Sequence, residues 1–144
     1  MIRKLIALAA AAIVCCSGVA RAQQGNADDG ETVFKKCMTC HRIGPEAKNL
    51  IGPNLTGVIG RQAGTQEGFA YSDLNKLAGA NGLVWTEDLI FKYLEDPTPF
   101  LKQFLTDKGK GDQAEGAAKM AFKLADEQDR RDVIAYLKTF SPPK

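Results

Sequence analysis

The chain has 144 residues, with 19 Lys or Arg, 17 Asp or Glu and one His, so its formal net charge is +2. Arg3, Lys4 and Arg21 lie in an N-terminal segment that we expect to be removed, which leaves 16 bases against 17 acids, a net charge of −1. This balance gives no support to nucleic-acid binding. The length suffices for one domain with one modest core.

Residues 1–22 have the pattern of a secretory signal peptide. Arg3 and Lys4 precede an apolar run over residues 5–14, and the segment ends at a small-x-small site closed by Ala22. The run is shorter than the roughly 20 residues that span a bilayer, so we expect cleavage rather than a membrane anchor. The prediction is a signal peptide over 1–22 followed by one domain over 23–144.

A short helix is predicted to begin at Asp28, whose side chain is a good N-cap and which is followed by Glu31 in a capping-box pattern. Val33 and Phe34 give this helix an apolar face. The helix would run directly into the most informative segment of the chain, residues 37–41.

Residues 37–41 form the motif C-x-x-C-H, which is typical of covalent attachment of a c-type haem. The thiols of Cys37 and Cys40 can each add to one vinyl group of a single haem, and the imidazole of His41 can bind its iron. His41 is the only histidine in the sequence. A zinc site would need four ligands, and these residues supply three. A redox-active Cys37–Cys40 pair is expected in a βαβ context, which the helical flanks do not provide.

The middle of the chain predicts loops and short helices. Residues 43–68 are rich in Gly, Pro and Asn and indicate loops. Ser72 is placed to cap a helix that extends to Leu77.

The second half predicts two longer helices and no strand. Thr86 is placed to cap the first of them, which we expect Pro97 to stop. Residues 106–116 are polar and Gly-rich and indicate an exposed loop. Asp126 is placed to cap the last helix, which Pro142 ends. The fold class is therefore predicted to be all-α.

Met120 is the candidate for a second iron ligand. Of the three methionines, Met1 lies in the signal segment and Met38 lies inside the attachment motif, on the His41 side of the haem. A thioether opposite histidine raises the reduction potential of haem iron. On the residue pattern alone, adaptable core filling is the more common role of a lone methionine such as Met120.

Further motifs follow the attachment site in a fixed order: Gly52-Pro53-Asn54-Leu55, Gly60-Arg61, Gly68-Phe69-Ala70-Tyr71-Ser72, Leu83-Val84-Trp85, Tyr93-Leu94-Glu95-Asp96-Pro97, Lys119-Met120-Ala121-Phe122 and Ile134-Ala135-Tyr136-Leu137. With these motifs the chain resembles the class I c-type cytochromes, and most closely the long bacterial cytochrome c2 type. The resemblance covers residues 30–140. It implies a small single-domain class I cytochrome c fold, with helices and loops wrapped around one covalently bound haem. The stretch from Pro97 to Met120 is longer than in mitochondrial relatives.

The resemblance also implies roles for individual residues. Cys37 and Cys40 would carry the haem, and His41 and Met120 would be the axial ligands of its iron. The carbonyl group of Pro53 would accept the imidazole N–H and so orient the ring.

Other residues are expected to contact the rest of the haem. Tyr71 and Trp85 would hydrogen-bond a propionate, and Arg61 would place a positive charge near it. Asn75 and Tyr93 would form a polar network beside the Met120 sulfur. Phe122 would close the exposed side of the crevice, and the first and last helices would cross, with Gly30 and Phe34 near Tyr136 and Leu137.

A chain of this type is expected to be a one-electron carrier rather than an enzyme, because two protein ligands leave the iron no open position. The resemblance implies a monomer of the periplasm, with a cytochrome bc1-type donor, a terminal oxidase or photosynthetic reaction centre as acceptor, and no nucleic-acid partner. The competing interpretations are a peroxidase or gas-binding haem protein, a fixed haem subunit of a larger oxidoreductase, and a thiol oxidoreductase.

Docking is predicted to use a lysine surface around the haem crevice, which would favour an acidic partner. The lysines concerned are Lys35, Lys36, Lys102, Lys108, Lys110, Lys119 and Lys123. Acidic residues are expected on the opposite side: Asp28, Asp29, Glu31, Asp126, Glu127 and Asp129.

Overall fold

The structure is a computed structural model that describes residues 24–142. The predicted signal peptide lies outside the described residues. Within them the order of elements is α1 (Ala27–Phe34), α2 (Asp73–Ala80), α3 (Glu87–Glu95), α4 (Pro97–Asp107), the 3-10 turn η1 (Gly111–Gln113) and α5 (Glu127–Lys138). The only β pairing in this part of the chain is an isolated antiparallel bridge between Gln62 and Val84, so the all-α prediction is confirmed.

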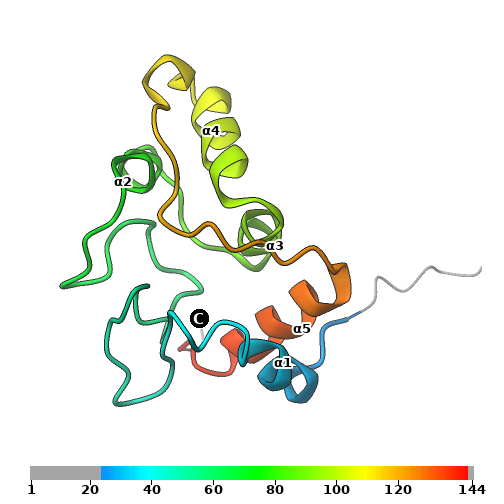
Figure 1. The fold of residues 1–144 in the computed structure, drawn as a ribbon. Coiled ribbons are helices and arrows are strands. Elements are labelled where there is room, and N and C mark those ends of the chain that lie inside the picture. The colour runs from blue at the N-terminus through cyan, green and yellow to red at the C-terminus, as the bar shows by residue number, and fades with distance from the viewer. Residues whose placement is uncertain (1–23, 143–144) are drawn as a thin grey trace, which may run out of the picture.

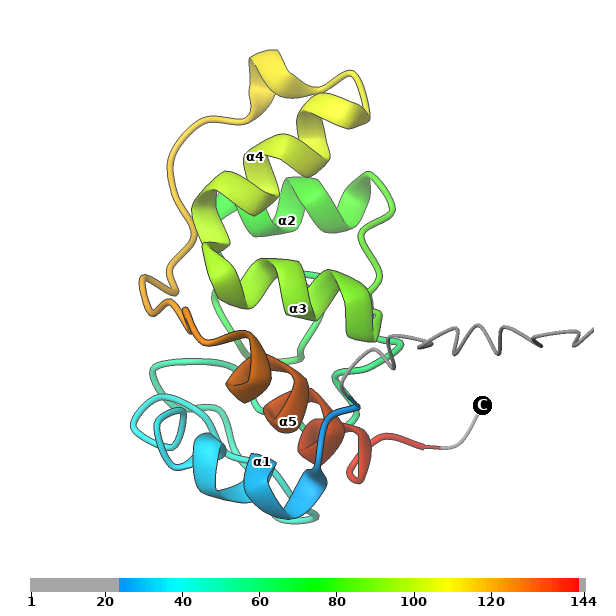
Figure 2. The same ribbon diagram turned by 90° about the vertical axis from the view of Figure 1, so that its right-hand side faces the viewer.

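The helices form two groups. Figure 1 shows α1 and α5 crossing at one end of the molecule, with α2, α3 and α4 at the other. In Figure 2, α4 lies above α2 and α3 below it, and α3 also contacts α5. The segment from η1 to α5 crosses from one group to the other (gold to orange in Figure 1), and it carries Met120. None of the helices between residues 24 and 142 has the length and apolarity needed to cross a membrane.

The crossing of α1 and α5 depends on a close backbone approach. A Cβ atom added to Gly30 would lie 2.0 Å from the carbonyl oxygen of Asp132, so only glycine fits. The rings of Phe34 and Tyr136 pack with their centroids 5.4 Å apart. The predicted crossing of the first and last helices is therefore confirmed.

The start of α1 was predicted wrongly. Its N-cap is Asn26, whose side-chain oxygen accepts hydrogen bonds from the backbone N–H groups of Asp28 (2.8 Å) and Asp29 (3.4 Å). Asp28 instead lies in the first turn, where its negative charge interacts favourably with the helix dipole. The backbone N–H of Asn26 also donates to Asp132 Oδ1 at 2.7 Å, so α5 fixes where α1 begins.

We therefore expect Asn26→Ala to cost about 1 kcal/mol of unfolding free energy, the usual loss for an N-cap. For a domain of this size that lowers the Tm by roughly 4 °C. Thermal unfolding followed by circular dichroism measures it, with Asp28→Ala as the matched variant. A larger loss in Asp28→Ala than in Asn26→Ala would contradict the assignment of the cap.

The other predicted caps are confirmed. Ser72, Thr86 and Asp126 accept hydrogen bonds from backbone N–H groups three residues further on, at 3.2, 3.2 and 2.8 Å. The helix after Ser72 continues to Ala80, past the predicted end at Leu77.

Pro97 does not simply stop a helix, as the sequence suggested, because it also begins the next one. It occupies the first turn of α4, where its missing N–H needs no partner. Leu101 and Leu105 of α4 are fully buried, so the helix is held by its packing. Helix α4 therefore extends to Asp107, into the predicted loop 106–116, and η1 follows within it.

Candidate haem site

The attachment motif lies on a tight turn that continues from α1. The N–H of Cys37 donates to the carbonyl of Phe34 (2.8 Å), and those of Cys40 and His41 donate to the carbonyl of Cys37 (3.0 and 2.9 Å). These bonds hold the two thiols and the imidazole within five consecutive residues. Cys37 and Cys40 are both free and half-buried.

His41 is held in one tautomer. His41 is 9 % exposed, and its Nδ1 lies 2.7 Å from the carbonyl oxygen of Pro53. Burial is the main cause that lowers the pKa of His41, so the ring is neutral at pH 7 and has one N–H. Because a carbonyl only accepts, that hydrogen is on Nδ1, and Nε2 keeps the lone pair that iron requires. The predicted contact between His41 and Pro53 is present.

Gly52 is a site residue that the sequence analysis did not single out. A Cβ atom there would lie 2.4 Å from Cε1 of His41 and 2.8 Å from Nε2, so the imidazole packs directly against the glycine backbone. The N–H of Gly52 donates to the carbonyl of Cys40 at 2.8 Å, which fastens this loop to the attachment motif. In the sequence, the position of Gly52 next to Pro53 was the signal that could have identified it as a site residue.

Arg61 brings a positive charge to the same region. Its guanidinium donates to the carbonyl of Asn54 at 2.9 Å and to the side-chain oxygen of Gln66. The charge of Arg61 contributes to lowering the pKa of His41 and acts against the burial that raises the pKa of Tyr71. Arg61, His41 and Tyr71 therefore lie within electrostatic reach of one another.

Trp85, which is buried, and the half-buried Tyr93 of α3 and Phe100 of α4 form an aromatic cluster. Their ring centroids are 4.8 Å (Trp85–Tyr93), 5.8 Å (Tyr93–Phe100) and 6.2 Å (Trp85–Phe100) apart. The backbone N–H of Trp85 donates to the carbonyl of Arg61 at 2.9 Å, so the expected propionate residues Trp85 and Arg61 are side by side. Burial raises the pKa of Tyr93, which keeps its phenol protonated as a donor.

Met120 lies half-buried in the extended segment between η1 and α5. Two backbone anchors flank it: the N–H of Ala118 donates to Thr98 Oγ1 (3.0 Å), and the N–H of Leu124 donates to the carbonyl of Leu94 (2.8 Å). Thr98 belongs to the start of α4, which the sequence did not predict. These anchors determine where the thioether lies.

The remaining predicted residues are placed less directly. Asn75 is buried on α2, and Phe122 is 43 % exposed. Among the hydrogen bonds of the described residues, the backbone N–H of Asn75 donates to Ser72 Oγ, and none joins Met120 to Asn75 or Tyr93, so the polar network beside the Met120 sulfur stays a prediction. The Met120 segment is connected to α3 through the backbone carbonyl of Leu94 and to α4 through the side-chain hydroxyl of Thr98.

The alternatives for Cys37, Cys40 and His41 find no support in the described residues. No group of three or more His, Cys, Asp or Glu side chains between residues 24 and 142 is arranged to hold a metal ion by itself. The turn that carries the thiols follows a helix and is not part of a βαβ unit. The donor set of two free thiols, an oriented imidazole and a distant thioether fits a covalently attached haem.

Comparison with known proteins gives the same result. The family model for cytochrome c matches residues 27–141. Cytochrome c2 iso-2 of Rhodospirillum centenum is 61% identical over 120 residues, which is 83% of this chain and 99% of that protein. Cytochrome c2 of Rhodopseudomonas palustris (strain ATCC BAA-98 / CGA009) is 56% identical over 142 residues, 96% of this chain and 99% of the relative.

A solved structure matches as well. The cytochrome c2 structure from Rhodospirillum centenum superposes with a TM-score of 0.81 at 62% identity, over 82% of this chain and 100% of that one. The chain belongs to the cytochrome c family, as a class I c-type cytochrome of the c2 type. It has one covalently bound c-type haem and is an electron carrier, not an enzyme.

Proposed function

We propose that this cytochrome is a diffusible, monomeric carrier of the periplasm, in which Cys37 and Cys40 bind the haem and His41 and Met120 are the axial ligands. The haem supplies one-electron oxidation and reduction of its iron. The observation that carries the proposal is the bond from Nδ1 of His41 to Pro53, which leaves Nε2 free on a turn that also presents two free thiols.

The other chain groups are proposed to bind the periphery of the haem. Arg61, Tyr71 and Trp85 would hold a propionate. The hydrogen bond from the Trp85 N–H to the Arg61 carbonyl supports this, and so does the effect of the Arg61 charge on the pKa of Tyr71. Tyr93, protonated because of its burial, and Asn75 would shape the polar surroundings of the Met120 sulfur. The polar side chains around the propionate would supply its hydrogen bonds and a compensating positive charge, and the aromatic rings would exclude water.

The axial ligands are tested by an absorption spectrum of the oxidised protein. We expect the weak far-red band of sulfur on ferric haem in the wild type and its loss in Met120→Ala. The reduction potential of that variant is expected to fall by roughly 0.1 V or more, within the range that axial ligands set. Met38→Ala is the matched control, because Met38 is 46 % exposed in the attachment turn. A wild type without the band, or with an open iron that binds carbon monoxide readily, would favour the gas-binding or peroxidase interpretation.

Residues 1–22 are proposed to be the signal peptide that exports domain 23–144 to the periplasm. The N-terminal residue and mass of the protein recovered from a periplasmic fraction test this. A mature chain that begins at Gln23 supports it, whereas a chain that retains residue 1 in a membrane fraction contradicts it.

The resemblance to c2-type carriers favours a cytochrome bc1-type complex as donor and a terminal oxidase or photosynthetic reaction centre as acceptor. Lysines would guide the docking of these redox partners, but two of the predicted docking lysines are in ion pairs. Lys36 Nζ lies 2.7 Å from Asp129 Oδ2, and Lys123 is paired with Asp96. Asp129 was expected on the opposite side from Lys36, so that part of the predicted charge separation is wrong.

Because Asp129 offsets the charge of Lys36, neighbouring lysines should differ in docking. Lys35 is exposed and has no ion pair with the described residues. We expect Lys35→Gln to lower the rate constant with an acidic redox partner by about twofold or more at low salt, and Lys36→Gln to have a smaller effect. Stopped-flow rates over a range of ionic strength measure this, since screening should remove the difference. Equal effects of both variants, or rates independent of salt, would contradict lysine-guided docking.

A further inference from the structure

We infer that Arg130 is a positioning residue for Met120: from the first turn of α5 it holds the end of the segment 116–126 and thereby keeps the thioether at the haem iron. The inference rests on the proposed ligation by Met120, and it adds a residue outside the haem crevice to the groups that control the ligand.

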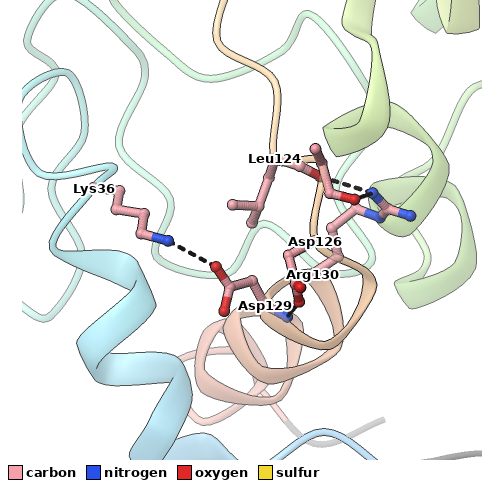
Figure 3. A network of polar contacts seen from close by, with 6 residues as sticks. Lys36, Leu124, Asp126, Asp129 and Arg130 are labelled. Carbon is pink, nitrogen blue, oxygen red and sulfur yellow. Dashed lines mark hydrogen bonds and ion pairs between the residues drawn. The ribbon is translucent and has the colours of Figure 1, made fainter.

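Arg130 is clamped onto the backbone that follows Met120. Its side chain is buried, and Nη1 donates to the carbonyl oxygens of Leu124 at 2.7 Å and Ala125 at 2.9 Å (Figure 3). The guanidinium also stacks over the ring of Phe91 in α3, 4.5 Å from its centroid. The guanidinium is thus fixed against α3, and its two close acceptors both belong to the Met120 segment.

The segment has few other fixed points. Between the backbone anchors at Ala118 and Leu124, residues 119–123 make no backbone–backbone hydrogen bond within the described chain. The side chains of Lys119 and Lys123 do make polar contacts, but they are exposed. Exposed contacts of this kind contribute little. The position of Met120 therefore depends on the anchors at the two ends, and Arg130 secures the second.

Stability alone does not account for an arginine at this place. The Nε atom of Arg130 is buried without a hydrogen-bond partner, which is unfavourable. Glu95 in α3 is 3.9 Å from Nη2 and largely exposed, so it compensates the buried charge only weakly. An apolar side chain of similar size would avoid both costs. What only the arginine provides is the pair of bonds to the Leu124 and Ala125 carbonyls.

The same turn of α5 also reaches the other ligand segment. Asp129, next to Arg130, pairs with Lys36, which immediately precedes Cys37 (Figure 3). One turn of helix therefore contacts the segment that leads to His41 and the segment that carries Met120. The Lys36–Asp129 pair is exposed and so contributes little, which makes Asp129→Asn a useful contrast to changes at Arg130.

The test uses the haem-loaded protein and an external ligand. Imidazole competes with Met120 for ferric iron, so a looser Met120 segment should bind imidazole more tightly. We expect Arg130→Gln to lower the Kd for imidazole roughly tenfold and Arg130→Lys to lower it less, since lysine keeps the charge but cannot bond both carbonyls in the same geometry. The far-red band should weaken in the same order.

Arg131→Gln is the matched control. Arg131 stacks on the same Phe91 ring at 4.8 Å and is paired with Glu127, but it makes no bond to the Met120 segment. It should leave the imidazole Kd close to wild type, as should Asp129→Asn. Val133→Ala, a buried change on α5 that faces the core, controls for global stability. It should lower the Tm without tightening imidazole binding.

Each outcome decides the matter. Unchanged imidazole binding in both Arg130 variants overturns the inference, and so does equal tightening in Val133→Ala at the same loss of Tm. If Arg130→Gln does not bind haem, Arg130→Lys alone decides. If Met120→Ala has the same far-red band and the same imidazole Kd as the wild type, the proposed ligation by Met120 is wrong. That failure is separate from a failure of the inference about Arg130.

Discussion

Gly52→Ala is expected to lower the yield of haem-loaded protein at least about tenfold. The added Cβ would lie 2.4, 2.7 and 2.8 Å from Cε1, Nδ1 and Nε2 of His41. The ring cannot retreat without breaking its bond to the Pro53 carbonyl. The backbone of Gly52 is not left-handed, so the effect would come from the collision and not from a loss of backbone freedom.

The yield is measured as the ratio of haem to protein after purification. Ile51→Ala is the matched control, because Ile51 immediately precedes Gly52 in the loop and is 74 % exposed. It should load haem like the wild type. A Gly52→Ala protein that takes up haem fully and keeps the wild-type reduction potential would show that the His41 ring has more freedom than the contacts indicate.

Gly30→Ala is expected to destabilise the fold by about 2–3 kcal/mol, at the upper end for a residue that overfills a packed site. Alanine favours a helix over glycine by about 1 kcal/mol, so helix propensity alone predicts the opposite sign. The collision decides the sign, since the new Cβ would lie 2.0 Å from the carbonyl oxygen of Asp132 and 2.9 Å from Cβ of Tyr136. Helices α1 and α5 would have to separate.

Chemical denaturation of the holoprotein measures this change. Thr32→Ala is the control, because Thr32 lies on the exposed face of the same helix and should lose no stability. The loss in Gly30→Ala should appear in the denaturant midpoint while the far-red band of the folded state is kept. A Gly30→Ala protein as stable as Thr32→Ala would mean that the two helices can shift apart without loss.

Local signals in the sequence were sufficient where the interacting atoms are close along the chain. The caps Ser72, Thr86 and Asp126 were predicted because each bonds an N–H three residues ahead. The haem attachment motif was predicted for the same reason, since its chemistry is contained in five consecutive residues. Pro53 was expected to accept from His41 only because of the family resemblance, and the structure shows that contact.

Local signals failed where a neighbour in space decides. Asp28 looked like a cap, but Asn26 takes that role because Asp132 of α5 fixes its backbone. Pro97 is equally suited to follow one helix or to begin another, and the burial of Leu101 and Leu105 selects the second.

The sequence by itself determined the haem attachment, the all-α class and most helix starts, because those follow from bonds between near neighbours in the chain. Only the tertiary structure decided the functions of Gly52 and Arg130. Gly52 matters because the imidazole of His41, eleven positions earlier, packs against it. Arg130 matters because the carbonyls of Leu124 and Ala125, in the segment that carries Met120, lie within hydrogen-bond distance of its guanidinium. Neither residue type signals such contacts locally, since they exist only once the loops and helices have packed together.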